Sequence, residues 1–547
     1  MRLTEFKKSK ATCYDELYSD TERREVNIPM LLDEARSAKS GTEQYFQKMR
    51  SYYDGTHLTQ SQTGQFIADS ELPWKPATVP DGYMHVESQI DSDVPDFEFS
   101  GREGSDESRA RAREAVVRYI CDSTDLERKN AMNERRLNMY GSAVWKLSVR
   151  EGALGAEVGV DDVSPEMIYP DPYAADVDGC ECIACVYKMS VMHAERVFAR
   201  DLMRLGTTAA KIASENSLDA RATDDIEVVE WWYRQPHDGE SRCEYTAGGE
   251  DIDGVCRFYS GDIALSILLG GREIRNVPRF WDKTGIQSFP FVIYSKTPRD
   301  GSIWGKSELE AIIPLIDAAD RQLAFAQLNT AFAANDVVIC EENAFASDSY
   351  PKNSPGAVWR LRPGMIDKVK RLGGMAADNI AHYEIVEKYR TLMKDTLGNY
   401  DYLQGSSTSQ VTTATGLALL SDRAGKRMNA KKICKKAGFE RLYRLMDYLA
   451  LEIYDEADLI RILGEGEDVS EFIGGGYVPQ IDVKVNIGDG IDNSRSFTLS
   501  ALSDLMAMDI DEENYPIVRA YISTLGIPER SSLCAAFDEK YKYEEEA

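Results

Sequence analysis

One stretch of the sequence has the residues, and nearly the spacing, of a phosphate-binding loop. It reads Asp300-Gly301-Ser302-Ile303-Trp304-Gly305-Lys306-Ser307 and lies between a strand-like and a helix-like segment. Loops of the type Gly-x4-Gly-Lys-Ser/Thr hold phosphates with backbone N–H groups and the lysine, at a helix N-terminus. Here the first glycine stands one residue too close, and Asp300 in its place would repel a phosphate. We therefore interpret the stretch as a turn with Ser307 as a helix N-cap, with a nucleotide-hydrolysing enzyme as the alternative.

Three closely spaced cysteines form the second candidate site. Cys180, Cys182 and Cys185 are followed by His193 eight residues later, and three thiolates with an imidazole could hold zinc. However, Cys-x-Cys is not the usual Cys-x-x-Cys spacing, and the residues from Glu181 to Tyr187 alternate as a strand does. We therefore favour a structural role for these cysteines and predict neither a metal nor a cofactor.

The remaining residues give no sign of a catalytic site. The chain contains five histidines, and none has the His-Glu-x-x-His spacing of a metalloprotease. The Gly-x-Ser-x-Gly turn that presents a nucleophilic serine does not occur. These patterns therefore offer no candidate for either kind of catalytic site.

Composition restricts the possible partners. The chain has 547 residues with 92 acidic and 64 basic ones, a formal net charge of −28. Such an excess of acid argues against a protein that coats DNA through many phosphate contacts, and against docking on an anionic membrane. We find no stretch of 18 apolar residues and no apolar leader after Met1, so we expect no membrane span and a cytosolic compartment.

Residue periodicity predicts an α+β chain whose first part is mixed. We predict a helix over 28–53, loops and short strands over 60–100, and a long helical region over 105–138 whose arginines, Arg113 included, face solvent. From 143 to 294 the chain is predicted to be mainly β, with one helix near 192–216. The clearest strands are 143–149, 226–233 and 289–294.

After residue 301 the pattern changes to long helices. Helices predicted over 306–335 and 377–397 bracket a β-rich insert at 336–374, so they must run out to the insert and back. A polar loop rich in Gly, Ser, Thr and Gln follows at 405–415, and then a long helix at 416–456. Residues 498–547 are predicted to be helical again. This order is suited to projecting a small domain on a two-helix stalk.

The long helix carries a concentration of basic residues that inverts the charge of the chain. Only Glu440 opposes the cations between residues 423 and 444. The basic residues are spread over much of the helix surface and leave one apolar stripe for packing. This stripe is formed by Met428, Ile433, Ala437, Leu442, Leu445 and Leu449. The basic side chains form a solvated face, pair with acidic surfaces of neighbouring subunits in an oligomer, or form a belt beside DNA phosphates. They are Arg423, Lys426, Arg427, Lys431, Lys432, Lys435, Lys436, Arg441 and Arg444.

In its order of features, the chain resembles the portal (head–tail connector) proteins of tailed bacteriophages from about residue 40 to 510. The resemblance rests on a series of motifs in sequence. They are Tyr52-Tyr53-Asp54-Gly55, Gly141-Ser142-Ala143-Val144-Trp145-Lys146, Val163-Ser164-Pro165-Glu166-Met167-Ile168-Tyr169-Pro170-Asp171-Pro172, Met189-Ser190, Phe289-Pro290-Phe291-Val292, Gly305-Lys306-Ser307-Glu308-Leu309 and Leu315-Ile316-Asp317-Ala318-Ala319-Asp320-Arg321-Gln322.

The resemblance implies a portal-type fold with an α/β wing, a two-helix stem, a small β-rich clip, a long wing helix and a short helical crown. The implied division is 1–304 (wing), 305–335 (first stem helix), 336–374 (clip), 375–397 (second stem helix), 398–415 (tunnel loop), 416–497 (long helix and return to the wing) and 498–547 (crown).

The resemblance also implies partners, and a function in which the chain is not an enzyme and has no catalytic residues of its own. Twelve copies would form a ring at one capsid vertex, through which a separate terminase ATPase packages double-stranded DNA without sequence specificity, and through which DNA is later ejected. Further partners would be the major capsid protein and head–tail adaptor or tail proteins, with the host cytoplasm as the site of assembly. A packaging-motor NTPase and another virion structural protein remain the alternatives.

The residues implied to face DNA or partners fall into three groups. Candidate DNA contacts in the stem are Arg321, Lys388, Arg390 and Lys394. Candidate tunnel-loop contacts are Gln404, Ser406, Ser407, Thr408 and Gln410. Candidate contacts of the clip with terminase or adaptor are Tyr350, Trp359 and Arg362.

Overall fold

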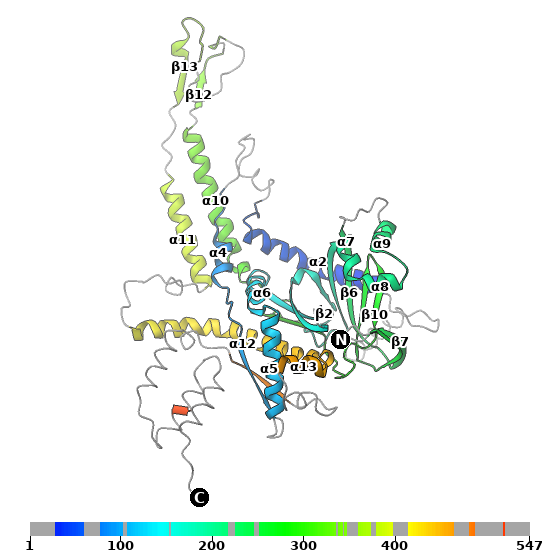
Figure 1. The fold of residues 1–547 in the computed structure, drawn as a ribbon. Helices are drawn as coiled ribbons and strands as arrows, with labels where there is room; N and C mark the ends of the chain where they lie inside the picture. Colours follow the sequence, from blue (N-terminus) through cyan, green and yellow to red (C-terminus); the bar gives the residue numbers. More distant parts are fainter. Residues whose placement is uncertain are drawn as a thin grey trace, which may run out of the picture.

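The computed structural model shows an α+β body from which two helices project, with a small hairpin at their far end (Figure 1). The candidate tunnel-loop residues from Gln404 to Gln410, Tyr350, and nearly all of 498–547 lie outside the described residues, as do the side chains of 414–431. The described residues are 28–58, 77–101, 107–152, 155–216, 225–245, 251–334, 337–342, 344–346, 359–372, 379–397, 414–463, 481–486 and 518–519.

Helices and strands alternate through the body before the long helices begin. The helices are α2 (Ile28–Tyr53), α4 (Asp81–Ser88), α5 (Glu107–Ser123), α6 (Leu126–Tyr140), α7 (Val191–Val197), α8 (Ala199–Arg204), α9 (Ala209–Asn216), α10 (Leu309–Ala334), α11 (Ile380–Leu397), α12 (Ala414–Ile453) and α13 (Glu456–Leu463), with short 3-10 helices η2 (Pro165–Met167) and η3 (Ile366–Lys368). The strands are β1 (Asp96–Gly101), β2 (Ser142–Gly152), β3 (Gly155–Val163), β4 (Ile168–Pro170), β5 (Cys182–Ser190), β6 (Asp225–Arg234), β7 (Gly239–Tyr245), β8 (Asp251–Phe258), β9 (Ile263–Leu269), β10 (Arg272–Val277), β11 (Phe291–Ser295), β12 (Val337–Cys340), β13 (Val369–Leu372) and β14 (Ile481–Asn486).

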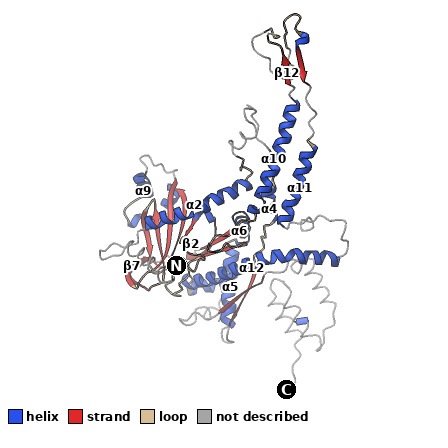
Figure 2. Cartoon of the chain, turned by 180° about the vertical axis from the view of Figure 1, so that it is seen from behind, coloured by secondary structure: helices blue, strands red, loops and turns tan. Residues whose placement is uncertain are grey.

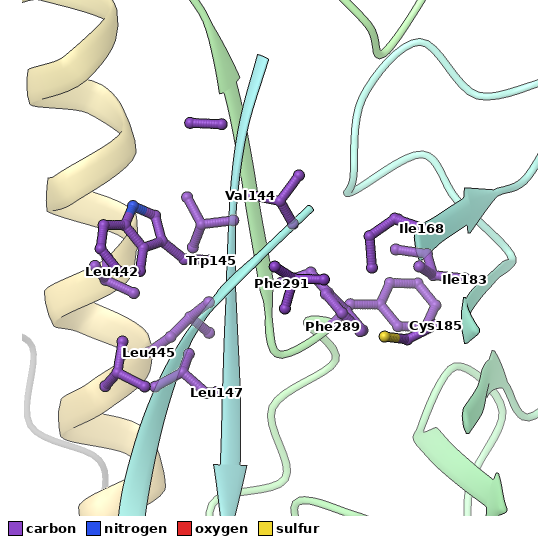
Figure 3. Packing of buried hydrophobic residues seen from close by; sticks show 14 of the residues in the cluster. Val144, Trp145, Leu147, Ile168, Ile183, Cys185, Phe289, Phe291, Leu442 and Leu445 are labelled. Atoms are coloured by element: carbon purple, nitrogen blue, oxygen red, sulfur yellow. The ribbon is translucent and has the colours of Figure 1, made fainter. Parts of the chain in front are cut away.

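The core of the body is a layered arrangement of two antiparallel sheets and the long helix α12. A sheet in the order β11-β2-β3 lies in the middle. Because side chains alternate along β2, Trp145 and Leu147 point to α12, where they meet Leu442 and Leu445 (Figure 3). On the other side, Phe291 and its neighbours meet the second sheet. The middle sheet is therefore buried on both faces.

The second sheet has the order β10-β9-β6-β5-β4, with antiparallel pairing between neighbours. Its outer face is covered by the N-terminal half of α2, where Ile28 and Leu32 pack against Trp231 and Leu268. Both faces of β6 are therefore buried from Val228 to Trp232, a stretch in which Glu230 is the one charged residue.

The helices α10 and α11 run antiparallel away from the body, and the hairpin of β12 and β13 lies at their far end (Figure 2). We call residues 337–346 and 359–372 the tip. Polar side chains join the two helices: His382 of α11 forms hydrogen bonds with Gln322 of α10 at 2.8 Å and with Asn329 of α10 at 3.2 Å. No described helix has the combined length and apolar character that a membrane span requires.

Several predicted helices are confirmed and others are divided. The helix over 28–53 is confirmed as α2, and the stalk helices are found as α10 and α11. The region 105–138 is two helices, because Asp125 adopts a left-handed conformation with φ of 53°. The helix near 192–216 is three short helices, and α4 forms where we predicted loops and strands.

Candidate functional site

The phosphate-loop-like stretch forms the joint between the body and α10, and its backbone donors are already used. The N–H of Gly305 donates to Ser142 Oγ at 2.8 Å, that of Lys306 to the Thr297 carbonyl at 2.8 Å, and that of Ser307 to Tyr45 Oη at 2.8 Å. A phosphate loop needs these groups for its ligand. Ser307 Oγ accepts a hydrogen bond from the Leu309 N–H at 3.2 Å, which confirms the predicted N-cap.

Two glycines make this joint too tight for a ligand. A Cβ on Gly141 would lie 2.5 Å from the Lys306 carbonyl carbon, and one on Gly305 would lie 2.4 Å from the Gly141 oxygen. The two backbones are therefore in direct contact at the place where a phosphate would sit. The geometry supports the turn interpretation and gives the NTPase alternative no binding site in this stretch.

The cysteines lie in and beside strand β5 and are buried as neutral thiols. Burial raises the pKa of Cys180 and of Cys185 to about 12, and it raises that of Cys182 as well. His193 points elsewhere, since its ring is exposed and contacts Arg196 at 3.2 Å. Within the part of the chain that the structure describes, no group of three His, Cys, Asp or Glu side chains is arranged to hold a metal ion. The geometry is that of a structural strand.

Two acidic side chains, Asp320 buried and Asp317 half-buried, fix the base of α10 to the body. Asp320 Oδ2 lies 2.7 Å from His57 Nε2, and Asp320 Oδ1 accepts the Val79 N–H at 2.6 Å. One turn earlier, Asp317 accepts a hydrogen bond from the Tyr52 hydroxyl at 2.7 Å, and the Tyr52 ring stacks on His57. The sequence analysis missed this cluster. The signal was available, because two aspartates three residues apart interrupt an otherwise apolar stripe.

The candidate stem cations differ in what they contact. The Arg390 guanidinium is paired with Asp81 of α4 at 3.1 Å, so it ties α11 to the body. Lys388 and Arg321 are exposed, and Lys394 is half-buried. Arg390 therefore contacts the body of its own chain, whereas Lys388 and Arg321 lie on the surface of the helix pair.

The distal half of α10 carries no charged side chain, and the charges of α11 balance. From Gln322 to Ala334, α10 carries no Asp, Glu, Lys or Arg. Along its whole length α11 carries three acidic and three basic residues, the first of them Glu384. The helix pair is therefore not a basic surface.

A shallow, open groove lies on the surface of α11, and apolar side chains line part of it. Ile380 and Tyr383 lie in the groove beside Glu384 and Lys388, and both are mostly exposed. Phe325 of α10 is also exposed. Exposed apolar groups of this size on a helix surface are typical of a contact face with another chain.

At Lys435 the structure differs from the prediction of an exposed basic helix. This lysine is only 4% exposed, and its Nζ donates to the Asp91 and Asp93 carbonyl oxygens at 3.1 and 3.0 Å and lies 3.0 Å from Asp91 Oδ2. Glu134, whose pKa is raised by burial, lies 3.6 Å away. Lys435 is therefore an internal clamp for α12, and the prediction that it belongs to an exposed basic belt is wrong.

The other residues of the basic helix divide between pairing and exposure. Arg441 forms two hydrogen bonds with Asp178 of the same chain, at 2.8 and 2.6 Å, a pairing within the subunit that the sequence did not predict. Lys436 and Arg444 are exposed, and Lys432 is half-buried. The predicted packing stripe is wrong at Ile433 and Ala437, which are exposed, and confirmed at Leu442, Leu445 and Leu449. The side chains of Arg423, Lys426, Arg427 and Lys431 lie outside the described residues.

The tip has a small core of its own. Phe345 is buried and meets the Trp359 ring edge-on, with 6.0 Å between centroids. Arg362 Nε donates to the Phe345 carbonyl at 3.1 Å. Two of the three residues predicted to contact partners, Trp359 and Arg362, therefore lie together in the tip. Arg362 also holds the backbone of the tip in place at Phe345.

One of the comparisons with known proteins finds a match. A family model described as the phage P22-like portal protein matches residues 31–489. No curated protein matches the chain. The matched region includes the body, the helix pair, the tip and α12.

Proposed function

The chain belongs to the phage P22-like portal protein family, and from this membership we propose that it forms a ring-shaped channel at one capsid vertex. Through this channel double-stranded DNA enters during packaging and leaves at ejection. In the proposal the chain is a non-catalytic conduit, and a separate terminase supplies the ATPase. The family match over 31–489 is the observation that carries the proposal.

In this proposal the body is the wing, α10 and α11 are the stem, and the tip is the clip. The segment 398–415 is the tunnel loop, 416–497 returns the chain to the wing, and 498–547 is the crown. What supports the assignment is the order of elements: two antiparallel helices bracket a hairpin, and a long helix follows them. The clip would face terminase during packaging and an adaptor or tail protein afterwards.

The charges of the helix pair suit passage of DNA better than retention. A wall rich in Lys and Arg would release many counterions from DNA, bind it tightly and slow it. Here the distal half of α10 is uncharged and α11 is balanced. We propose Lys388 and Arg321 as the phosphate contacts of this wall. Arg390 has a smaller part, because its guanidinium is paired with Asp81.

The proposal also gives the groove on α11 an occupant. In a closed ring each subunit meets its neighbour through two different surfaces. We propose that the groove beside Ile380 and Tyr383 receives the neighbouring subunit's helix pair, and that Phe325 lies on the opposite contact face. Ring closure would then bury the apolar side chains that are exposed in a single subunit.

Negative-stain images of the purified protein test the proposal. We expect rings of about a dozen subunits with a central hole. Monomers, closed shells or hexamers without a hole would contradict it. Deleting 405–410 in the tunnel loop should leave the rings intact and impair packaging or retention of DNA. Loss of rings in that variant would instead make the loop structural.

A further inference from the structure

The second half of the tip inverts the charge of the chain. Residues 359–372 contain five basic residues and one acidic residue, Asp367, in a protein with a net charge of −28. Arg360, Arg362, Lys368 and Lys370 are all exposed. Lys368 is paired with Glu341 at 2.7 Å, whereas no described carboxylate pairs with Arg360 or Lys370. This segment therefore offers positive charge at the point of the described structure farthest from the acidic body (Figure 1).

Two isoleucines stand among these cations. Ile366 is 75% exposed and Ile339 is 53% exposed. In the hairpin, Ile339 of β12 is directly opposite Lys370 of β13, so the two side chains share one face of the ribbon. An aliphatic group and an ammonium group are therefore presented side by side.

The surface is held in shape before any partner binds. The Phe345–Trp359 contact forms its core, and Arg362 bonds to the Phe345 carbonyl. The backbone is closed by the bond from the Glu341 N–H to the Lys368 carbonyl at 3.2 Å. A preformed surface loses little conformational entropy on binding, which favours affinity.

We propose that this surface docks a partner protein that presents carboxylates around an apolar side chain. The cations alone would suit DNA phosphates equally well. Exposed isoleucines, however, gain nothing from a phosphate, whereas an apolar centre with a polar, arginine-containing rim is the composition of a protein–protein interface. The partner supplies acidic groups for Arg360 and Lys370 and an apolar group for Ile366. The inference rests on the proposed function, in which the tip meets terminase and adaptor.

Binding measurements on the full-length protein test this inference. The probes are the purified large terminase subunit and the purified head–tail adaptor of the same phage, each at low and at moderate salt, with a short DNA duplex as a third probe. The double variant Arg360→Glu/Lys370→Glu should weaken binding of at least one protein probe roughly tenfold and flatten its salt dependence. Ile366→Ser should weaken binding roughly tenfold and leave the salt dependence unchanged.

A charge-matched control keeps the interpretation specific. Lys211 and Arg272 are exposed on the body, and Lys211→Glu/Arg272→Glu should stay within about twofold of the wild type. Binding of neither protein probe to the wild type, or equal binding by all variants, overturns the inference. If the tip variants lose the duplex and keep the protein probes, the surface binds nucleic acid instead.

Images of the same preparations separate this failure from failure of the proposed function. Intact rings in every variant with unchanged protein binding refute the docking surface alone. Rings that disappear only in the tip variants make the surface a contact between copies, which also overturns the inference. A wild type that forms no rings refutes the channel itself.

Discussion

The base of α10 and its distal half belong to one continuous helix, yet their side chains are satisfied in different ways. At the base, the buried Asp320 and the half-buried Asp317 are held in hydrogen bonds with the body. Beyond Arg321 the helix has no charge, and Phe325 is exposed. The base therefore fixes the direction in which the helix pair leaves the body. The distal half leaves its surface available for a neighbour and for DNA in the proposed channel.

The substitution with the largest expected effect on stability is at Asp320, where the base of α10 meets the body. Asp320→Ala leaves His57 without its partner and the Val79 N–H without its acceptor. A buried polar group left without its hydrogen-bond partner costs about 1–3 kcal/mol, and this substitution leaves two, so we expect a loss of about 2–6 kcal/mol in the free energy of unfolding. Denaturant titration at one fixed protein concentration measures it. Lys388→Ala, at an exposed position of α11, is the control, and an equal loss there would refute the distinction.

Buried charge in the body predicts a pH dependence that the distal half of α10 lacks. Burial raises the pKa of Asp447 from 3.8 to about 6, and Arg113 at 3.4 Å lowers it in part. The folded state therefore holds this proton more tightly than the unfolded state, and stability rises as the pH falls from about 6 to about 4. Relative to Asp447→Asn, the wild type should gain up to about 3 kcal/mol over this range. A pH-independent difference would contradict the prediction.

The joint below α10 gives the next effect. Gly141 and Gly301 both have positive φ, 86° and 68°, but a Cβ on Gly301 meets nothing within 4 Å. Gly141→Ala should therefore cost about 2 kcal/mol more than Gly301→Ala, because only its Cβ clashes with the backbone of Lys306. Thermal unfolding of the two variants measures the difference. Equal melting temperatures would mean that the backbones at the joint are not in contact.

The smallest expected effect separates the two stem cations. Arg390→Ala removes the pair with Asp81 and should lower stability by about 1 kcal/mol. Lys388→Ala should leave stability unchanged and reduce only the interaction with DNA in the assembled channel. Chemical denaturation and a packaging assay on both variants compare them. The assignment fails if Lys388→Ala is the less stable variant.

The sequence predicts local structure better than the orientation of helices toward the body. The N-cap at Ser307 follows from a serine before an apolar helix, and α2 follows from its apolar periodicity. Arg113, predicted to face solvent, is 1% exposed, and Lys435 is a clamp inside the body. Both errors have one cause. A long charged side chain can be buried wherever another segment supplies a partner, and the segment that supplies it is distant in sequence.

The same reasoning explains which features of the candidate site could be predicted from the sequence and which could not. The order of the helices and of the β-rich insert could be read from the sequence, because each is a local pattern. The pairing of Arg390 with Asp81 and of Lys435 with Asp91 could not, because those aspartates precede their partners by about 300 residues or more. The five cations of 359–372 were visible in the sequence, and their exposure with Ile366 emerged from the fold.

The central claim is that the helix pair forms the wall of a DNA channel, and a cryo-electron microscopy reconstruction of the purified ring tests it most directly. The account predicts that α10 and α11 of every subunit surround the central axis, with the uncharged half of α10 near the tip and the tips at one end of the channel. A ring in which the helix pairs point outward, away from the axis, or an assembly with no continuous central channel, would contradict it.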